Sequence, residues 1–225
     1  MDEIFRKWIP EASDEQLTKL NVYYDMLVDW NGRMNLTAIT EREEVAQKHF
    51  ADSLLPASLI PEGARLIDVG TGAGFPGLVL KLMRPDIKLT LLDSLNKRIG
   101  FLQAVCGELG LSDVTCIHAR AEDGARDKAL RESFDVAAAR AVAHTAFLAE
   151  WLLPYLKVGG QALLYKGPQA AEELDAAENA CKLLCCKATT QSYDVPWGER
   201  CVVRLKKLAP TDKRYPRKAG AKEHL

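Results

Sequence analysis

The sequence lacks an apolar run of the about 20 residues that a membrane-spanning helix needs. Its N-terminus has neither the basic start nor the apolar stretch of a secretory signal peptide. A strong excess of charge is also missing, because 30 lysines and arginines stand against 31 acidic residues, for a formal net charge of -1. We therefore expect a cytoplasmic protein without a membrane partner, and any nucleic-acid binding must use a local basic patch.

Paired cysteine spacing is absent as well. No CxxC motif occurs among the six cysteines, which are Cys106, Cys116, Cys181, Cys185, Cys186 and Cys201. Cys181 and Cys185 would share a helix face, so a metal site is one interpretation of this pair. Metal sites usually have paired ligand spacing, however, and cytosolic thiols are reduced. We expect free thiols and no metal.

What is present indicates one soluble globular protein, with 48% hydrophobic residues in 225. The first part of the chain has helical periodicity. One helix is predicted to begin at a capping box formed by Ser13 and Gln16 and to end near Asn31-Gly32. A second helix is predicted over Thr40–Leu55, with Glu43 completing its capping box.

From residue 66 onward, short β-rich runs alternate with helical patterns. The predicted strands are Leu66–Val69, Leu89–Leu92, Val114–Ile117, Phe134–Ala138, Ala162–Tyr165, Thr189–Val195 and Cys201–Lys206. Amphipathic helices are expected over Lys97–Leu109 and Ala146–Leu156. Strands separated by helices form parallel βαβ units, whereas the last two strands form an antiparallel hairpin. The fold class is therefore α/β, with a mostly parallel seven-stranded sheet, a closing antiparallel hairpin and an N-terminal helical extension.

A glycine loop follows the first predicted strand and reads Asp68-Val69-Gly70-Thr71-Gly72-Ala73-Gly74-Phe75-Pro76-Gly77. Glycines let the backbone approach a ligand closely, and the amides of the next helix face that ligand. The segment from Gly72 to Gly77 satisfies the dinucleotide pattern GxGxxG. Gly70, Gly72 and Gly74 also form the GxGxG pattern common in S-adenosylmethionine enzymes. Asp93 ends the second strand, where a carboxylate can bind the ribose of either cofactor.

The choice between these cofactors depends on the rest of the chain. A dehydrogenase normally needs an acid or base beside the hydride acceptor and a separate substrate domain. The closing hairpin leaves little room for such a domain, so an S-adenosylmethionine-dependent methyltransferase is favoured. A nicotinamide-dependent reductase, a methyltransferase for a small molecule or another RNA, and a non-catalytic RNA-binding module remain the alternatives.

Several separated motifs carry a more specific pattern. They are Trp30-Asn31-Gly32-Arg33-Met34-Asn35-Leu36-Thr37, His49-Phe50-Ala51-Asp52-Ser53-Leu54, the glycine loop, Asp93-Ser94 with Lys97-Arg98 and Phe101-Leu102, Arg120-Ala121-Glu122, Ala139-Arg140-Ala141, Lys166-Gly167, and Tyr215-Pro216-Arg217-Lys218-Ala219-Gly220. In this order they resemble the motifs of the bacterial ribosomal small-subunit methyltransferase G family, also called the glucose-inhibited division protein B family. The resemblance covers nearly the whole chain.

This resemblance implies a class I, Rossmann-like methyltransferase fold. We expect one methyltransferase domain, made of an N-terminal helical extension (1–60), a core (61–208) and a basic C-terminal tail (209–225). The implied reaction methylates N7 of a guanine in 16S rRNA of the small ribosomal subunit, with S-adenosylhomocysteine as the second product, and we expect a monomer. The implied cofactor contacts are Gly70, Phe75, Ala121, Glu122 and Arg140, to which the glycine loop and the second strand add Gly72, Gly74 and Asp93.

No catalytic residue is assigned, because guanine N7 has an exposed lone pair and needs no general base to attack a methyl group. The substrate-side candidates are Asn35, His49, Lys166 and Arg200. Lys166 could contact guanine or phosphate, or be a solvated lysine at a strand end. Asn35 could instead cap a helix, and His49 could lie at the edge of the core. Arg140 could hold the cofactor or pair with a carboxylate.

A run of cations near the C-terminus favours RNA binding, because such a run attracts phosphate. It consists of Arg200, Arg204, Lys206, Lys207, Lys213, Arg214, Arg217, Lys218 and Lys222, with only Asp212 and Glu223 as acids among them. A solvated tail is the alternative interpretation. The predicted RNA-binding residues are Lys166, Arg200, Arg204, Arg217 and Lys218.

Overall fold

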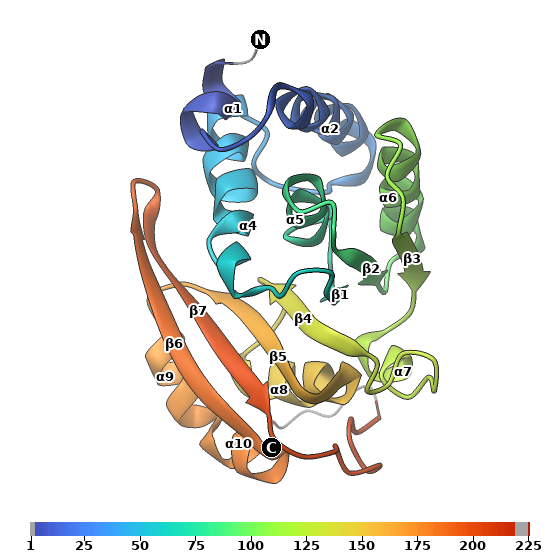
Figure 1. Ribbon diagram of the computed structural model, residues 1–225, viewed down its shortest axis with the longest axis vertical. Coiled ribbons are helices and arrows are strands. Elements are labelled where there is room, and N and C mark those ends of the chain that lie inside the picture. The colour runs from blue at the N-terminus through green and yellow to red at the C-terminus, as the bar shows by residue number, and fades with distance from the viewer. Residues whose placement is uncertain (1–2, 219–224) are drawn as a thin grey trace.

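A seven-stranded sheet crosses the computed structural model, which describes residues 3–218 and 225 (Figure 1). The strands are β1 (Arg65–Val69), β2 (Lys88–Asp93), β3 (Val114–His118), β4 (Phe134–Arg140), β5 (Leu156–Lys166), β6 (Cys186–Val195) and β7 (Gly198–Lys207). Their order in the sheet is β3-β2-β1-β4-β5-β7-β6. The first five strands pair in parallel, and β7 pairs antiparallel with both β5 and β6. All seven predicted strands and the closing hairpin are confirmed.

Helices cover both faces of the sheet. The helical segments are α1 (Glu3–Trp8), α2 (Asp14–Met34), α3 (Arg42–Val45), the π-helix η1 (Ala46–Ala51), α4 (Asp52–Leu54), η2 (Ala57–Leu59), α5 (Gly77–Met83), α6 (Asn96–Glu108), α7 (Ala121–Gly124), α8 (Thr145–Leu152), η3 (Leu153–Tyr155), α9 (Ala170–Ala176) and α10 (Glu178–Leu183). Figure 1 places α1, α2, α5 and α6 over one face and α8, α9 and α10 over the other. Within the described residues, no helix is both long and apolar enough to cross a membrane.

The N-terminal helices differ from the predicted ones at two boundaries. The capping box of α2 is present, since Gln16 N donates to Ser13 Oγ at 3.2 Å and Ser13 N donates to Gln16 Oε1 at 2.9 Å. The helix does not end at Asn31-Gly32 but continues to Met34, because Asn35 takes the left-handed conformation (φ 50°) that terminates it. Asn31 remains helical, and its side chain accepts a hydrogen bond from Thr37 N at 2.9 Å.

The capping box predicted at Thr40 is wrong. Helix α3 begins at Arg42, and Glu41 precedes it without a side-chain cap. The Glu43 carboxylate instead accepts hydrogen bonds from Lys7 Nζ at 2.7 Å and Trp8 Nε1 at 3.2 Å. The Glu43 carboxylate therefore binds side chains of α1 instead of capping its own helix.

The predicted segment boundaries at residues 60 and 208 remain a prediction. Phe5 and Leu17 from the N-terminal helices belong to the same buried cluster as Leu66 and Val136 from the sheet. At the other end, Arg131 donates to the Thr211 and Tyr215 carbonyls, both at 2.9 Å. The described part of the C-terminal segment is therefore held against the core.

Candidate functional site

The carboxyl ends of the parallel strands bring most of the predicted residues to one edge of the sheet. Gly70 follows β1, and Asp93, Arg140 and Lys166 end β2, β4 and β5. Because β7 runs antiparallel, its beginning lies at the same edge, and Arg200 pairs with Tyr193 there. Ligands of open α/β sheets bind at this edge.

The glycine loop has left-handed backbone at three positions, with φ of 71° at Gly70, 61° at Gly72 and 100° at Gly74. A Cβ at Gly74 would lie 2.6 Å from Tyr23 Oη and 2.7 Å from Leu78 Cδ1, so packing requires this glycine. A Cβ at Gly72 would meet no heavy atom within 4 Å. Gly72 is therefore the point at which the loop faces open space that a bound molecule could use.

Asp93 fixes the shape of this loop. Its Oδ2 accepts hydrogen bonds from Gly72 N at 2.9 Å and Arg98 Nη1 at 3.2 Å, and its Oδ1 accepts one from Leu95 N at 2.9 Å. The residue is only 1% exposed. The structure thus gives Asp93 a positioning function, and its contact with a ribose remains a prediction.

Asp68 is a site residue that the sequence reasoning missed, although it begins the glycine motif. Its Oδ2 accepts hydrogen bonds from Thr71 Oγ1 at 2.7 Å and Gly77 N at 2.8 Å. Burial raises the pKa of this carboxyl from 3.8 to about 6. The buried Oδ1 has no hydrogen-bond partner among the described residues. A free carboxylate oxygen beside a loop with open space at Gly72 fits a cofactor that carries an ammonium group, as S-adenosylmethionine does.

Arg140 connects the sheet to the N-terminal helices. Its Nη1 lies 3.3 Å from the carbonyl oxygens of Lys48 and His49 and 3.3 Å from Asp52 Oδ2. The guanidinium also lies over the Phe75 ring, 5.1 Å from its centroid. Of the two interpretations left open by the sequence, carboxylate pairing is the one seen here, and cofactor contact remains a prediction.

His49 lies between Arg140 and Thr37. Its ring stacks on Phe75 at 4.5 Å between centroids, its Nδ1 faces Arg140 Nη2 at 3.3 Å, and its Nε2 lies 2.8 Å from Thr37 Oγ1. Burial, with the Arg140 charge second, lowers the His49 pKa from 6.5 to about 3. The ring is therefore neutral. Because a guanidinium can only donate, Nδ1 is the acceptor and Nε2–H donates to Thr37.

Asp52 is a second site residue that the sequence did not predict, although it belongs to the motif His49-Phe50-Ala51-Asp52-Ser53-Leu54. It is 5% exposed, and its Oδ2 faces Arg140. Its Oδ1 accepts hydrogen bonds from Arg200 Nε at 2.7 Å and Trp197 Nε1 at 3.1 Å. One carboxylate thus joins the N-terminal helices, β4 and the β6–β7 hairpin, and no local sequence signal could have predicted these partners.

A cavity of about 630 Å³ opens beside this network. Arg140, Arg200 and Asp52 line it together with the loop over residues 141–144 and the end of β5. Val142 in that loop lies 2.9 Å from the Cβ position of Gly70, so the cavity borders the glycine loop. This places a cavity lined by both cations and carboxylates next to the predicted cofactor loop.

Lys166 lines the same cavity but is already paired. Its Nζ donates to Glu173 Oε2 at 2.6 Å and to the Ala143 carbonyl at 2.7 Å, and its side chain is 9% exposed. It is therefore not a solvated strand-end lysine, and its predicted contact with guanine or phosphate would require it to leave Glu173.

The remaining candidates lie around this edge. Ala121 and Glu122 form the start of α7 after β3, and the Ala121 carbonyl accepts a hydrogen bond from Tyr155 Oη at 2.7 Å. The Ala119 amide donates to the Asp93 carbonyl at 3.1 Å, which places this segment beside the end of β2. Asn35 is the C-cap of α2, as the capping interpretation expected.

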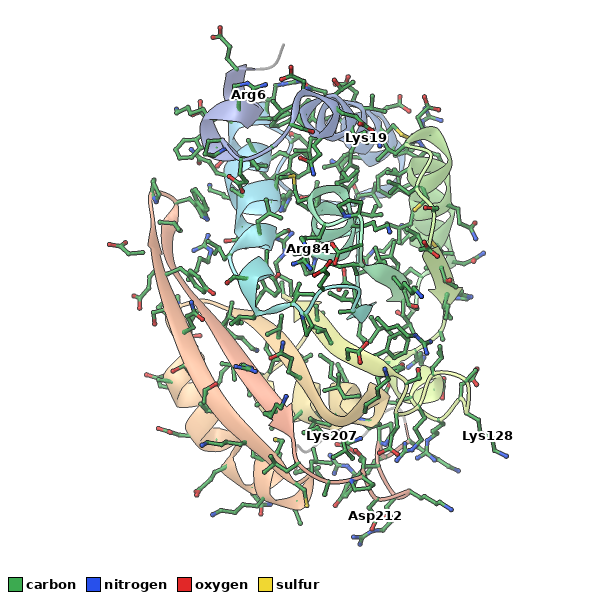
Figure 2. All side chains as sticks on the ribbon, in the orientation of Figure 1. Arg6, Lys19, Arg84, Lys128, Lys207 and Asp212 are labelled. Carbon is green, nitrogen blue, oxygen red and sulfur yellow. The ribbon has the colours of Figure 1, made fainter. Side chains whose placement is uncertain are left out.

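The cations near the C-terminus do not form one patch. Lys207 is fully buried and donates to Glu132 Oε1 at 2.7 Å and to two main-chain carbonyls (Figure 2). Arg217 pairs with the buried Glu150 through two nitrogens at 2.7 to 3.1 Å. Arg204 and Arg200 lie toward opposite ends of β7. Lys218 is exposed, and Lys222 lies outside the described residues.

Thiols and metal ligands give no further centre in the described part of the chain. The six cysteines are free. No group of three or more histidine, cysteine, aspartate or glutamate side chains there could hold a metal ion.

His49→Gln should reduce the loss of stability on acidification. Between pH 6.5 and about 3, the unfolded chain binds a proton at His49 that the folded chain does not. His49 therefore does not lower the free energy of unfolding above pH 6.5. As the pH falls below that value, protonation of His49 in the unfolded chain lowers the free energy of unfolding by up to about 1.4 kcal/mol per pH unit. Asp68 contributes with the opposite sign, since its folded pKa is raised, but it does so in both proteins. Urea unfolding from pH 7 to 4.5 measures the difference, and parallel curves would contradict it.

Comparison with known proteins identifies the family. The family model described as "rRNA small subunit methyltransferase G" matches residues 16–195. The ribosomal RNA small subunit methyltransferase G of Alkaliphilus oremlandii is 47% identical over 215 residues, which are 93% of this chain and 90% of that protein. The protein of the same description from Streptococcus sanguinis is also 47% identical, covering 93% and 91%.

Solved structures support the fold. A SAM-dependent methyltransferase from Aquifex aeolicus superimposes with a TM-score of 0.57 at 16% identity, covering 76% of this chain and 96% of the other. At this identity the likeness establishes the fold alone. The family match and the two relatives establish more: the chain belongs to the rRNA small subunit methyltransferase G family of methyltransferases.

Proposed function

We propose that this protein transfers a methyl group from S-adenosylmethionine to N7 of one guanine in 16S rRNA, giving 7-methylguanosine and S-adenosylhomocysteine. The observation that carries this proposal is the cavity lined by Arg140 and Arg200, which borders the glycine loop at Gly70. The proposal includes action in the cytoplasm, as a monomer and without a metal ion.

In this proposal the glycine loop holds the cofactor. Gly70, Gly72 and Gly74 shape it, Asp93 fixes Gly72, and the unpartnered oxygen of Asp68 is available for an ammonium group. The proposed contacts further along the chain are Phe75, Ala121, Glu122 and Arg140. S-adenosylmethionine, when bound, supplies an electrophilic methyl group on a sulfonium.

The residues around the cavity have to orient the guanine rather than activate it. N7 attacks with its own lone pair, so alignment of the reacting atoms supplies the main rate advantage. A neutral His49, with its pKa lowered to about 3, agrees with a site in which no proton is removed from the base. Arg200 can interact with guanine O6 or with phosphate, and Asp52 holds it beside Arg140, the proposed cofactor contact. N7 lies in the deep groove of an RNA helix, so the target guanine should be unpaired or splayed out.

Labelled S-adenosylmethionine and small ribosomal subunits from cells without this enzyme test the proposal. We expect the label in one nucleoside of 16S rRNA, identified as 7-methylguanosine by digestion and mass spectrometry. Label in another nucleoside, or in a small molecule after RNase treatment, would contradict it and favour the alternative acceptors. Stabilisation by NADH rather than S-adenosylmethionine in a thermal-shift comparison would favour a reductase.

A further inference from the structure

A second cavity, of about 460 Å³, lies at the opposite edge of the sheet. Its walls are the turn before β1, the start of β4, the first half of β5 and the last part of β7. Arg84 fixes the chain beside it by donating to the carbonyls of Ala57, Ile60 and Pro61 at 3.3 to 3.4 Å (Figure 2). The cavity therefore has a defined wall and is separate from the site at the carboxyl edge.

Two buried polar atoms without hydrogen-bond partners belong to residues that line this cavity. They are Gln161 Oε1 and Arg204 Nε, and neither has a partner among the described residues. Gln161 is 4% exposed, and its Nε2 donates to the Leu59 carbonyl, so its unpaired atom is the acceptor. A buried group left unpaired costs about 1 to 3 kcal/mol. An unpaired donor and an unpaired acceptor at one cavity indicate a ligand that carries both a hydrogen-bond acceptor and a hydrogen-bond donor.

The charges at the cavity favour an oxyanion. Among the described residues, Arg204 and Lys206 form no ion pair, whereas Lys157 is neutralised by Asp135 at 2.8 Å. Glu62 supplies the other carboxylate of the wall. The two cations without an ion pair, Arg204 and Lys206, thus exceed the single exposed carboxylate of Glu62, and the cavity has a net positive charge.

The walls also leave room for a bound group. Gly63 and Gly159 both line the cavity, and a Cβ on either would meet no heavy atom within 4 Å. Both have positive φ, 66° and 83°, so larger residues would be strained there. The backbone therefore carries no side chain at these two turns, and the cavity stays open there.

We propose that this cavity binds an RNA phosphate together with a neighbouring ribose 2′-hydroxyl. Arg204 and Lys206 hold the phosphate, and Gln161 Oε1 accepts a hydrogen bond from the hydroxyl. The choice of RNA as the source of the phosphate rests on the proposed function, since a free phosphorylated compound carries the same groups.

The position of the cavity indicates that it binds a segment of the RNA that flanks the methylated guanine. Arg200, Arg204 and Lys206 lie on the same face of β7, because side chains alternate along a strand. Lys206 lies six residue steps along the strand from Arg200, which is about 20 Å at about 3.4 Å per step. The cavity therefore contacts RNA some distance from the guanine that is methylated, and it adds affinity and preference for RNA over DNA.

The test measures binding of a single-stranded RNA oligonucleotide and of DNA with the same sequence by fluorescence anisotropy at several salt concentrations. Gln161→Leu should weaken RNA binding by about five- to tenfold through the lost hydrogen bond and leave DNA binding unchanged. Arg204→Gln should weaken both and lower the slope of log affinity against log salt by about one. Lys128→Gln removes one charge from an exposed side chain elsewhere and should change neither (Figure 2).

Unchanged RNA and DNA binding in folded Gln161→Leu and Arg204→Gln proteins would overturn the proposal. Inorganic phosphate that binds the wild type, is lost in Arg204→Gln and does not compete with RNA would also overturn it, in favour of a small phosphorylated ligand. Should Gln161→Leu fail to fold, the partly exposed Arg204 still carries the test. These measurements need no methyl transfer, so a failure of the proposed function leaves their outcome readable.

Discussion

Gly72→Val is expected to abolish S-adenosylmethionine binding while the chain keeps its fold. A Cβ at Gly72 would meet no protein atom within 4 Å, so a side chain there would extend into the open space beside the loop. A bound cofactor would need that space. We expect the dissociation constant, measured by isothermal titration calorimetry, to rise by at least about 100-fold, which corresponds to about 2.7 kcal/mol.

Backbone strain has to be separated from this effect. Valine at φ 61° costs about 1 to 2 kcal/mol wherever it occurs. Gly110 provides the matched control, because it has φ 60°, is exposed and also has no atom within 4 Å of a Cβ. Gly110→Val should lose similar stability and keep full cofactor affinity. Normal affinity in Gly72→Val would refute the assignment of the loop.

Asp52→Asn is expected to have the second largest effect, on both stability and methyl transfer. The Asp52 carboxylate is the shared counter-ion of Arg140 and Arg200, and it is 5% exposed. Its amide replacement has almost the same shape but leaves two half-buried guanidinium groups without their negative partner. Removing one member of a buried ion pair costs about 3 to 5 kcal/mol, and screening by water at Arg200 places the expected loss near the lower value, about 3 kcal/mol.

The same substitution should lower kcat/KM for small ribosomal subunits by about 100-fold, because both cations of the cavity lose their position. Asp52 is here a positioning residue, and because Arg140 is also a proposed contact of S-adenosylmethionine, the dissociation constant for that cofactor should rise as well. Asp29→Asn is the control: its pair with Arg33 is exposed and should contribute less than about 1 kcal/mol. Equal unfolding free energies and equal kcat/KM for the two variants would contradict the function assigned to Asp52.

Local signals were sufficient for most of the fold. Short apolar runs predicted β1, β2, β4 and β5, because strands buried on both faces have to be apolar over several consecutive residues. Strand β6 is largely exposed and polar, and its prediction rested on the hairpin pattern with β7. The capping box at Ser13 was also readable, since both of its hydrogen bonds join residues three apart. The box at Thr40 was not, because Glu43 bonds to Lys7 and Trp8, about 35 residues away.

The candidate site divides in the same way. By itself, the sequence determined the order of strands and helices, the glycine loop and the edge at which Gly70, Asp93 and Arg140 meet, because the direction of parallel strands fixes where their ends lie. Only the tertiary structure decided which side chains pair there. It paired Lys166 with Glu173, buried Lys207, joined Arg140 and Arg200 through Asp52, and left Gln161 Oε1 without a partner among the described residues at the far edge. The physical reason is that the partners of a polar or charged side chain come from segments that are distant in the sequence. The residues next to it in the chain therefore do not reveal its ion pairs and hydrogen bonds.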